Sequence, residues 1–119
     1  MTKQSKKSEV KIQFIKELNE KSIPSVRLTR SRDGSTGTAK FRFINANILS
    51  KDKSKRGEIT GMYLIDEEGV LKTKDINAIF INGKPIGVES LLIIKGNNSW
   101  NRFMRFMRRY STKNKLKFY

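Results

Sequence analysis

Neither cysteine nor histidine occurs among the 119 residues of this chain. Without cysteine, the protein cannot form a disulfide, a zinc–thiolate site or a cysteine nucleophile. Without histidine, it lacks the commonest general base and the commonest metal ligand. An enzyme could still use carboxylates or lysines, but these two absences favour a binding protein over a catalyst.

Long apolar runs are also missing. The run Leu91–Ile94 is as long as any in the chain, whereas a membrane-spanning helix needs roughly 20 apolar residues. The first residues do not combine a charged segment, an apolar stretch and a small-residue cleavage site, so we expect no secretory signal. The length suits one domain, and the sequence predicts a small, soluble, single-domain protein.

Acidic residues are few: 11 aspartates and glutamates stand against 26 lysines and arginines, which gives a net charge of +15. Such a charge attracts anions, whether nucleic acid, an acidic protein face or an anionic lipid. The chain is also rich in asparagine and isoleucine, so codon bias explains part of the lysine excess equally well. Clustered arginines are the more informative signal.

Alternating apolar and polar residues predict a series of short strands. The expected strands cover residues 10–14, 26–31, 38–44, 58–66, 70–74, 76–81 and 85–94. The pairs Asp33-Gly34 and Asn82-Gly83 predict hairpin turns, because the central residues of such turns need positive φ angles.

From Trp100 the apolar period changes from two to about 3.6, which predicts a C-terminal amphipathic helix. Asn97 or Asn98 can cap its start, and residues 112–114 end it. Its apolar stripe contains Trp100, Phe103, Met104, Met107 and Tyr110, and its basic side contains Arg102, Arg105, Arg108 and Arg109. We expect the apolar stripe to pack on the strands.

The expected fold is therefore α+β: a small antiparallel β-sheet with a single C-terminal amphipathic α-helix packed on it. Residues 10–112 form the one domain. We expect residues 1–9 to be a disordered basic extension and residues 113–119 a basic tail.

Phe41 and Phe43 lie among Lys40 and Arg42, an arrangement that could stack nucleic-acid bases. Alternation puts both phenylalanines on one face and the basic residues on the other, so burial in the core is the favoured interpretation. A small basic RNA-binding sheet protein is the alternative function, and exposed phenylalanines would be its sign.

The arginines of the helix have two interpretations. They are either a solvated face or a docking surface for an acidic partner, to which the planar guanidinium is suited. The adjacent acids Asp66, Glu67 and Glu68 precede Gly69, and we expect them in a solvated turn rather than at a metal.

Several strands carry apolar residues on both faces, but one helix can cover only one face of a sheet. The other face is covered by another strand pair or offered to a partner. An open sheet edge suits a partner that adds a strand, and the strands that begin at Val26 and Thr60 fit best. The candidate partner-binding residues are Arg27, Thr29, Arg30, Arg32, Asp33, Thr60, Met62, Arg102 and Arg105.

Five segments resemble the photosystem II assembly-factor family numbered twenty-eight in the Psb series. They are Ile23–Gly34, Gly37–Phe43, Ile59–Gly69, Phe80–Pro85 and Trp100–Tyr110, of which the last is the most specific. Together they span about residues 10–110. The lysine-rich N-terminal extension, Arg108 and the strongly basic tail depart from the family's pattern.

The resemblance implies a non-catalytic accessory protein without a cofactor or a small-molecule substrate. Such a protein docks transiently on immature photosystem II, beside the inner antenna chlorophyll protein and the reaction-centre loops, where segments of membrane subunits extend its sheet. The expected location is peripheral, on the stromal side of the chloroplast thylakoid membrane, or on the cytoplasmic side in a cyanobacterium. Lysine, asparagine and isoleucine bias favours a plastid genome, and nucleic acid is not expected as a partner.

Overall fold

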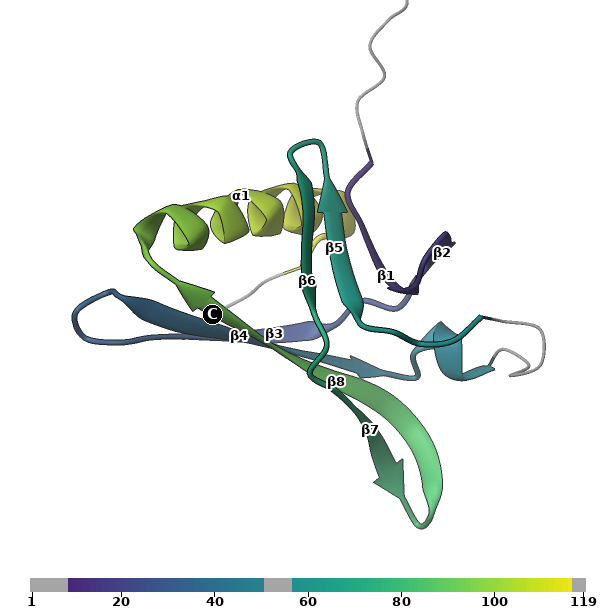
Figure 1. Cartoon of the computed structure of the whole chain (residues 1–119). Helices are drawn as coiled ribbons and strands as arrows, with labels where there is room; N and C mark the ends of the chain where they lie inside the picture. Colours follow the sequence, from purple (N-terminus) through teal and green to yellow (C-terminus); the bar gives the residue numbers. More distant parts are fainter. Residues whose placement is uncertain (1–8, 51–56, 117–119) are drawn as a thin grey trace, which may run out of the picture.

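The computed structural model describes residues 9–50 and 57–116. Within them the chain forms two four-stranded antiparallel sheets, a short 3₁₀ helix and one α-helix (Figure 1). Sheet A has the strand order β2-β1-β5-β6, and sheet B has the order β3-β4-β8-β7. The elements are β1 (Lys11–Ile15), β2 (Leu18–Asn19), β3 (Ser25–Arg30), β4 (Thr36–Ile44), η1 (Asn47–Ser50), β5 (Met62–Asp66), β6 (Gly69–Thr73), β7 (Ile76–Ile81), β8 (Lys84–Lys95) and α1 (Asn97–Asn114).

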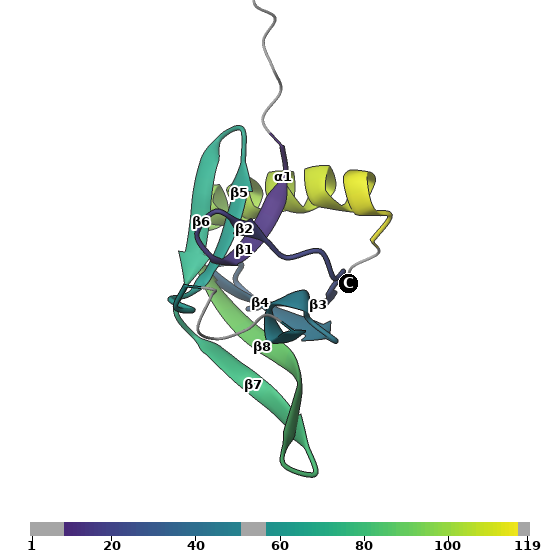
Figure 2. The same ribbon diagram turned by 90° about the vertical axis from the view of Figure 1, so that its right-hand side faces the viewer.

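Sheet B is organised around the long strand β8, which pairs with β4 on one side and β7 on the other. The turn between β7 and β8 places Asn82 at φ 51° and Gly83 at φ 79°. These are the positive angles that the sequence predicts for a tight hairpin, and the hairpin is confirmed. Its far end projects from the body of the molecule (Figures 1 and 2).

The hydrophobic core lies between the two sheets and α1. Ala39, Phe41 and Phe43 of β4 are fully buried in it, as alternation predicts. Phe14 of β1 meets Phe43 edge-on, with 5.0 Å between the ring centroids, and so joins sheet A to sheet B. Phe41 meets Phe103 of α1 in the same way at 6.3 Å. Burial of each such side chain contributes about 1.5–3 kcal/mol.

Sheet A supplies a second inner face to the same core. Its inner face buries Ile12 of β1 together with Met62 and Leu64 of β5. The expected α+β class is confirmed, but its strands form two sheets rather than one small sheet. The surplus apolar surface on the outer faces is not covered by further strands of the described residues: Ile93, on the outer face of sheet B, is 58% exposed, and Val70, on the outer face of sheet A, is 55% exposed.

Helix α1 starts one residue after Gly96, whose φ of 88° places glycine in the N-cap position. Neither asparagine caps the helix with its side chain, so that prediction is wrong. The side-chain Oδ1 of Asn97 instead accepts a hydrogen bond from the Arg30 guanidinium at 2.6 Å. The buried face of α1 contains Phe103, Phe106, Met107 and Tyr110. Trp100 and Met104, which the sequence places on this face, are only half-buried.

One strand bound differs clearly from the expectation, because β5 begins at Met62 rather than at residue 58. Helix α1 ends at Asn114, within the expected residues 112–114. The apolar period marks which residues face the core, but a strand begins only where its neighbours supply hydrogen bonds. Pairing with β6 begins at Met62, and pairing with β1 begins at Tyr63. Residues 1–8 of the expected extension and 117–119 of the expected tail lie outside the described residues.

Candidate docking surface

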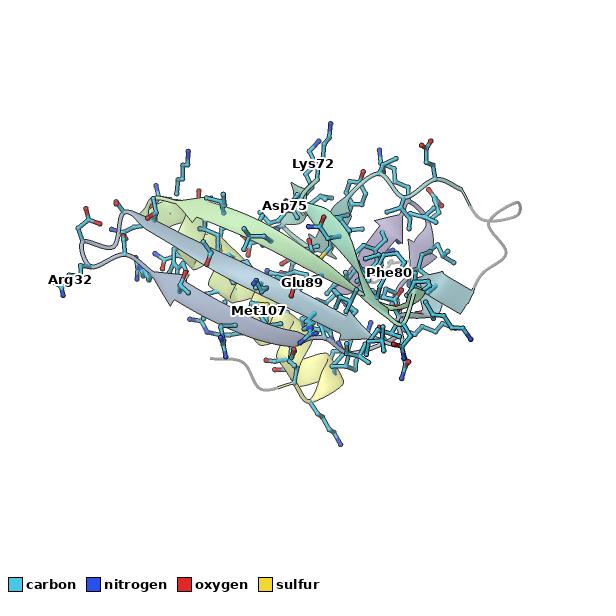
Figure 3. All side chains as sticks on the ribbon, turned by 90° about the horizontal axis from the view of Figure 1, so that it is seen from below. Arg32, Lys72, Asp75, Phe80, Glu89 and Met107 are labelled. Carbon is cyan, nitrogen blue, oxygen red and sulfur yellow. The ribbon has the colours of Figure 1, made fainter. Side chains whose placement is uncertain are left out.

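Five of the nine candidate residues come together on the β3–β4 hairpin of sheet B. Arg27, Thr29 and Arg30 lie on β3, and Arg32 and Asp33 lie in the turn that follows. β3 is an edge strand, because among residues 9–50 and 57–116 it pairs with β4 only. Figure 3 shows Arg32 at the tip of this hairpin, at the opposite end of sheet B from Phe80.

The hydrogen-bond pattern decides which β3 groups are free. The Ser31 N–H donates to the Thr36 carbonyl at 2.8 Å, and antiparallel pairs alternate between bonded and non-bonded. In the register of β3 with β4, the bonded residues are therefore Thr29 and Arg27. Leu28 and Arg30 direct their N–H and C=O groups away from β4, toward the open edge.

Only part of this open side is accessible. Val26 has the same parity as Leu28 but is 1% exposed, whereas Leu28 is half-buried and Arg30 is exposed. The outward backbone groups of Leu28 and Arg30 make up what we call the β3 edge. It is long enough to pair with a few residues of an extended segment.

A shallow hollow of about 260 Å³ lies beside this strand, on the face of sheet B that points away from the core. Its basic side chains are Arg27, Lys40 and Arg42, and its one acid is Glu89, which is 4.0 Å from Arg42. Ser25 and Val26 complete the lining. Three cations against one carboxylate favour an acidic side chain as the occupant.

The turn after β3 is braced by Asp33. Its Oδ1 accepts hydrogen bonds from Ser35 N–H at 3.0 Å, Ser35 Oγ at 2.7 Å and Ser31 Oγ at 2.8 Å. These bonds, that from the Ser35 backbone first, lower the pKa of Asp33 to about 2. Asp33 therefore holds the turn in shape, while Arg32 projects into solvent beside the β3 edge.

Arg30 ties the same hairpin to the helix. Its guanidinium lies over the Trp100 ring, 4.8 Å from the ring centroid, and also donates to Asn97. Across from it, Gly37 of β4 leaves room for the indole, since a Cβ there would lie 2.4 Å from Trp100 Cζ3. The absence of a side chain at Gly37 allows Trp100 to pack on the hairpin.

The helix arginines do not form a free stripe. Arg102, Arg105 and Arg109 bind the acids of the β5–β6 turn, an arrangement that we call the ion-pair cluster. Its closest contacts are Arg102–Asp66 at 2.7 Å, Arg105–Glu68 at 2.8 Å, Arg109–Asp66 at 2.8 Å and Arg109–Glu68 at 2.6 Å, with Glu67 at 3.8 Å from Arg109. The acids lie at the expected turn, but the expectation that the turn is solvated is wrong for Asp66 and Glu68, whose carboxylates bind arginines.

The ion-pair cluster lowers the pKa values of two of its acids, Asp66 and Glu68. Burial raises the pKa of Asp66, but hydrogen bonds from Arg102 and Arg109 outweigh it, and the net pKa is lowered. Hydrogen bonds from Arg105 and Arg109 lower the pKa of Glu68 to about 2. Both carboxylates are thus ionised at neutral pH and hold the β5–β6 hairpin to α1.

Met62 lies on β5, a strand without an open edge, whereas Thr60 precedes this strand. β5 pairs with β1 on one side and β6 on the other, so the prediction that a partner strand could pair with β5 is wrong. Met62 is fully buried, and the Thr60 hydroxyl is 2.6 Å from the Tyr63 hydroxyl. Alternation identifies strand faces but not strand neighbours, which depend on long-range pairing.

The exposed phenylalanines expected for the alternative RNA-binding function are not observed at positions 41 and 43. Phe41 and Phe43 are both fully buried, so neither offers a ring face to a nucleic-acid base. Their neighbours Lys40 and Arg42 are exposed on the opposite face of β4. The core interpretation of the phenylalanines is confirmed.

One exposed feature was not among the candidate residues. Phe80 and Ile81, at the far end of the projecting β7–β8 hairpin, are 59% and 55% exposed. The signal in the sequence was the uninterrupted apolar stretch Ala78–Ile81 immediately before the Asn82-Gly83 turn. Apolar side chains on both faces of a hairpin tip have no core to enter.

The described residues contain no group of three or more acidic side chains arranged to hold a metal ion. In the same part of the chain, no helix has the length and the apolar character needed to cross a membrane.

Comparison with known proteins identifies the family. The family model described as Psb28 protein matches residues 12–118. The Photosystem II reaction center Psb28 protein of Phaeodactylum tricornutum is 66% identical over 110 residues, which cover 92% of this chain and 96% of the relative. The proteins of the same name from Guillardia theta and Pyropia yezoensis are 62% and 59% identical over 107 residues, covering 90% of this chain and 92% and 93% of the relatives.

The match extends through both sheets and α1, and it includes the β3–β4 hairpin, the ion-pair cluster and the projecting β7–β8 hairpin. It agrees with the resemblance found in the sequence segments. The chain belongs to the Psb28 family of photosystem II reaction center proteins.

Proposed function

We propose that this protein is a non-catalytic accessory factor that docks transiently on immature photosystem II and assists its assembly or repair. Docking occurs by strand addition: an extended segment of a membrane subunit pairs with the β3 edge. The partners are core subunits, namely the inner antenna chlorophyll protein and reaction-centre loops. The protein works peripherally at the stromal face of the plastid thylakoid, as the algal sources of its relatives favour.

The observation that carries the proposal is the edge position of β3. Leu28 and Arg30 turn their backbone donors and acceptors outward, and within the described residues no strand pairs with them. Unpaired strand edges are templates for a further strand, with main-chain hydrogen bonds supplying affinity and neighbouring hollows supplying specificity.

Charge supports the same surface. Arg27 and Arg32 are exposed beside the edge, and the hollow lined by Arg27, Lys40 and Arg42 accepts an acidic side chain of the added segment. The helix arginines contribute less than expected, because Arg102 and Arg105 already bind Asp66 and Glu68. Arg30 is also committed, to Trp100 and Asn97.

The test removes one outward donor and keeps the fold. Proline at Leu28 deletes an N–H that points to the open edge, where proline is tolerated. Leu28→Ala is the matched control, since it removes the same side chain and keeps the N–H. After circular dichroism has verified both folds, each tagged protein is used to capture photosystem II intermediates from detergent-solubilised thylakoids.

We expect Leu28→Pro to lose at least tenfold in capture relative to Leu28→Ala. Arg30→Pro with Arg30→Ala is the second pair, should Leu28→Pro not fold. Equal capture by the proline and alanine variants overturns strand addition at β3. Ala78→Pro tests the other edge of sheet B, because β7 is that edge and Ala78 directs its N–H outward there. If only Ala78→Pro loses capture of photosystem II intermediates, strand addition at β3 is also overturned.

A further inference from the structure

The outer face of sheet A carries a regular arrangement of side chains that the proposed docking surface does not use. The pairing register sets Lys11 beside Ile65 and Ile65 beside Val70, and it sets Gln13 beside Tyr63 and Tyr63 beside Lys72. Residues paired in a sheet point to the same face. Lys16 and Lys74 follow directly beyond β1 and β6.

Four lysines therefore gather on one face, and we call it the lysine face: Lys11, Lys16, Lys72 and Lys74. Three of them are exposed, and Lys11 is half-buried. No carboxylate of the described residues forms an ion pair with any of the four. The Lys16 ammonium lies over the Tyr63 ring, 5.8 Å from the ring centroid.

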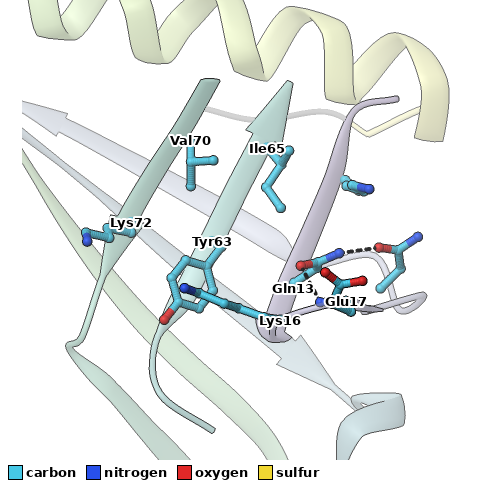
Figure 4. A pocket seen from close by; sticks show the side chains of 9 residues that line it. Gln13, Lys16, Glu17, Tyr63, Ile65, Val70 and Lys72 are labelled. Carbon is cyan, nitrogen blue, oxygen red and sulfur yellow. Dashed lines mark hydrogen bonds between the residues drawn. The ribbon is translucent and has the colours of Figure 1, made fainter. Parts of the chain in front are cut away.

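This face is hollowed around Tyr63. Two adjoining hollows, of about 600 and 760 Å³, share Lys16, Tyr63 and Lys72 in their linings. Figure 4 shows the Lys16 side chain crossing the Tyr63 ring, with Lys72 on the neighbouring strand. The acids that line the hollows are Glu17 and Glu58, one in each, so four positive charges stand against two negative ones.

We infer that the lysine face binds the anionic headgroups of a lipid bilayer and holds this side of the protein against the membrane surface. The inference rests on the proposed function only in placing the protein beside a membrane. Lysines near an anionic bilayer strengthen binding by roughly fivefold each at low salt, and the effect fades within a Debye length.

The distribution of the two basic residue types favours lipid over an acidic protein segment. Arginine forms fixed, planar pairs with carboxylates, as Arg102, Arg105 and Arg109 do within this chain. The lysine face contains no arginine. Strongly hydrated ammonium groups on flexible stems suit a diffuse, mobile layer of headgroups. Val70, 55% exposed on the edge strand β6 of this face, adds apolar contact with the interfacial region.

The test compares two variants of equal net charge. The face variant carries Lys11→Gln, Lys16→Gln, Lys72→Gln and Lys74→Gln. The control variant carries Lys21→Gln, Lys84→Gln, Lys95→Gln and Lys115→Gln, which change four exposed lysines elsewhere. Both keep the full chain, and both are first checked by circular dichroism. Binding to vesicles of phosphatidylcholine alone and of phosphatidylcholine with phosphatidylglycerol is measured by co-sedimentation at low and high salt.

We expect the parent to bind only the anionic vesicles, and more weakly at high salt. The face variant should bind them at least tenfold more weakly than the control variant. Equal losses in both variants would mean that net charge alone acts and would overturn the inference. A second result would also overturn the inference: the face variant binds soluble polyglutamate more weakly than the control variant does, but binds anionic vesicles equally well. That result would assign the face to an acidic protein.

The vesicles contain no photosystem, so this result is independent of strand addition. Leu28→Pro should bind anionic vesicles as the parent does even if it no longer captures photosystem II. Conversely, failure of the β3 proposal would leave the vesicle measurement intact. A Tyr63→Phe protein provides a further control, because it keeps the ring beneath Lys16 and should retain vesicle binding within about twofold.

Discussion

Arg102 forms a bidentate ion pair with Asp66: Nη1 donates to Oδ2 at 3.0 Å and Nη2 donates to Oδ1 at 2.7 Å. Asp66 lies at the end of β5, and its side chain has no exposed surface, whereas 16% of the Arg102 side chain remains exposed. This contact joins sheet A to α1 across 36 residues of chain.

Loss of the buried carboxylate should therefore be costly. We expect Asp66→Asn to lower the free energy of unfolding by about 2–4 kcal/mol, because Arg102 and Arg109 would lose their charged acceptor in a partly buried site. Glu67→Gln is the matched control; Glu67 is 56% exposed and 3.8 Å from Arg109, and its loss should cost under about 1 kcal/mol. Urea denaturation measures both, and equal effects would contradict the ion-pair cluster as a stabilising contact.

Stability should fall in acid within a defined window. The pKa of Glu68 drops from its ordinary value of 4.5 to about 2 in the folded protein, chiefly through hydrogen bonds from Arg105 and Arg109. A depressed folded pKa means that the stabilising effect is complete above pH 4.5 and is lost as the pH falls toward 2. Asp66 and Asp33 shift in the same direction and add to the loss.

Melting temperature measured from pH 6 to pH 2 tests this window. Glu68→Gln should flatten the curve in the acid range, since the residue can no longer take up a proton there. An unchanged slope in the variant would show that Glu68 is not linked to folding in this range.

The contact between Gly37 and Trp100 gives a third prediction. Gly37→Ala places a methyl group against the indole and 2.9 Å from the Thr29 carbonyl oxygen, and overpacking of this kind costs about 1–3 kcal/mol. Trp100→Ala should relieve the clash with the ring but not the one with the backbone. The double variant should therefore lose less stability than the sum of the two single variants, by at least about 0.5 kcal/mol. Strict additivity in urea unfolding would contradict this contact.

A fourth prediction separates free from committed arginines in docking. Arg27→Gln should slow association with photosystem II intermediates at low salt, because an unpaired surface charge acts mainly on the association rate. Arg105→Gln should leave that rate within about twofold of the parent, since Arg105 is bound to Glu68. The association rate is measured on surface-immobilised protein at two salt concentrations. A larger effect of Arg105→Gln than of Arg27→Gln would show that the helix arginines belong to the docking surface.

Local patterns predicted most of the elements and the faces of their residues. The burial of Phe41, Phe43 and Phe103 follows from periods of two and 3.6 residues, and the Asn82-Gly83 turn follows from backbone sterics. Long-range pairing could not be read in this way. Nothing local distinguishes β3, an edge strand, from β5, an interior one, because the same alternation fits both positions.

The candidate site was predicted in part for the same reason. Arg102 and the acids at 66–68 were each recognised, but their separation in sequence concealed that they meet. Proline at the candidate residue Thr29 would not test strand addition, because the Thr29 N–H faces β4 and its loss would break the sheet itself. Only the register assigns outward donors to Leu28 and Arg30.

The position of Trp100 has a practical consequence. It is the one tryptophan in the chain, and a cation from β3 lies over its ring at 4.8 Å. Indole emission depends on nearby charge, so a segment that pairs with β3 and displaces Arg30 should alter the fluorescence of the unlabelled protein. The molecule thus carries its own optical reporter at the strand proposed to receive photosystem II.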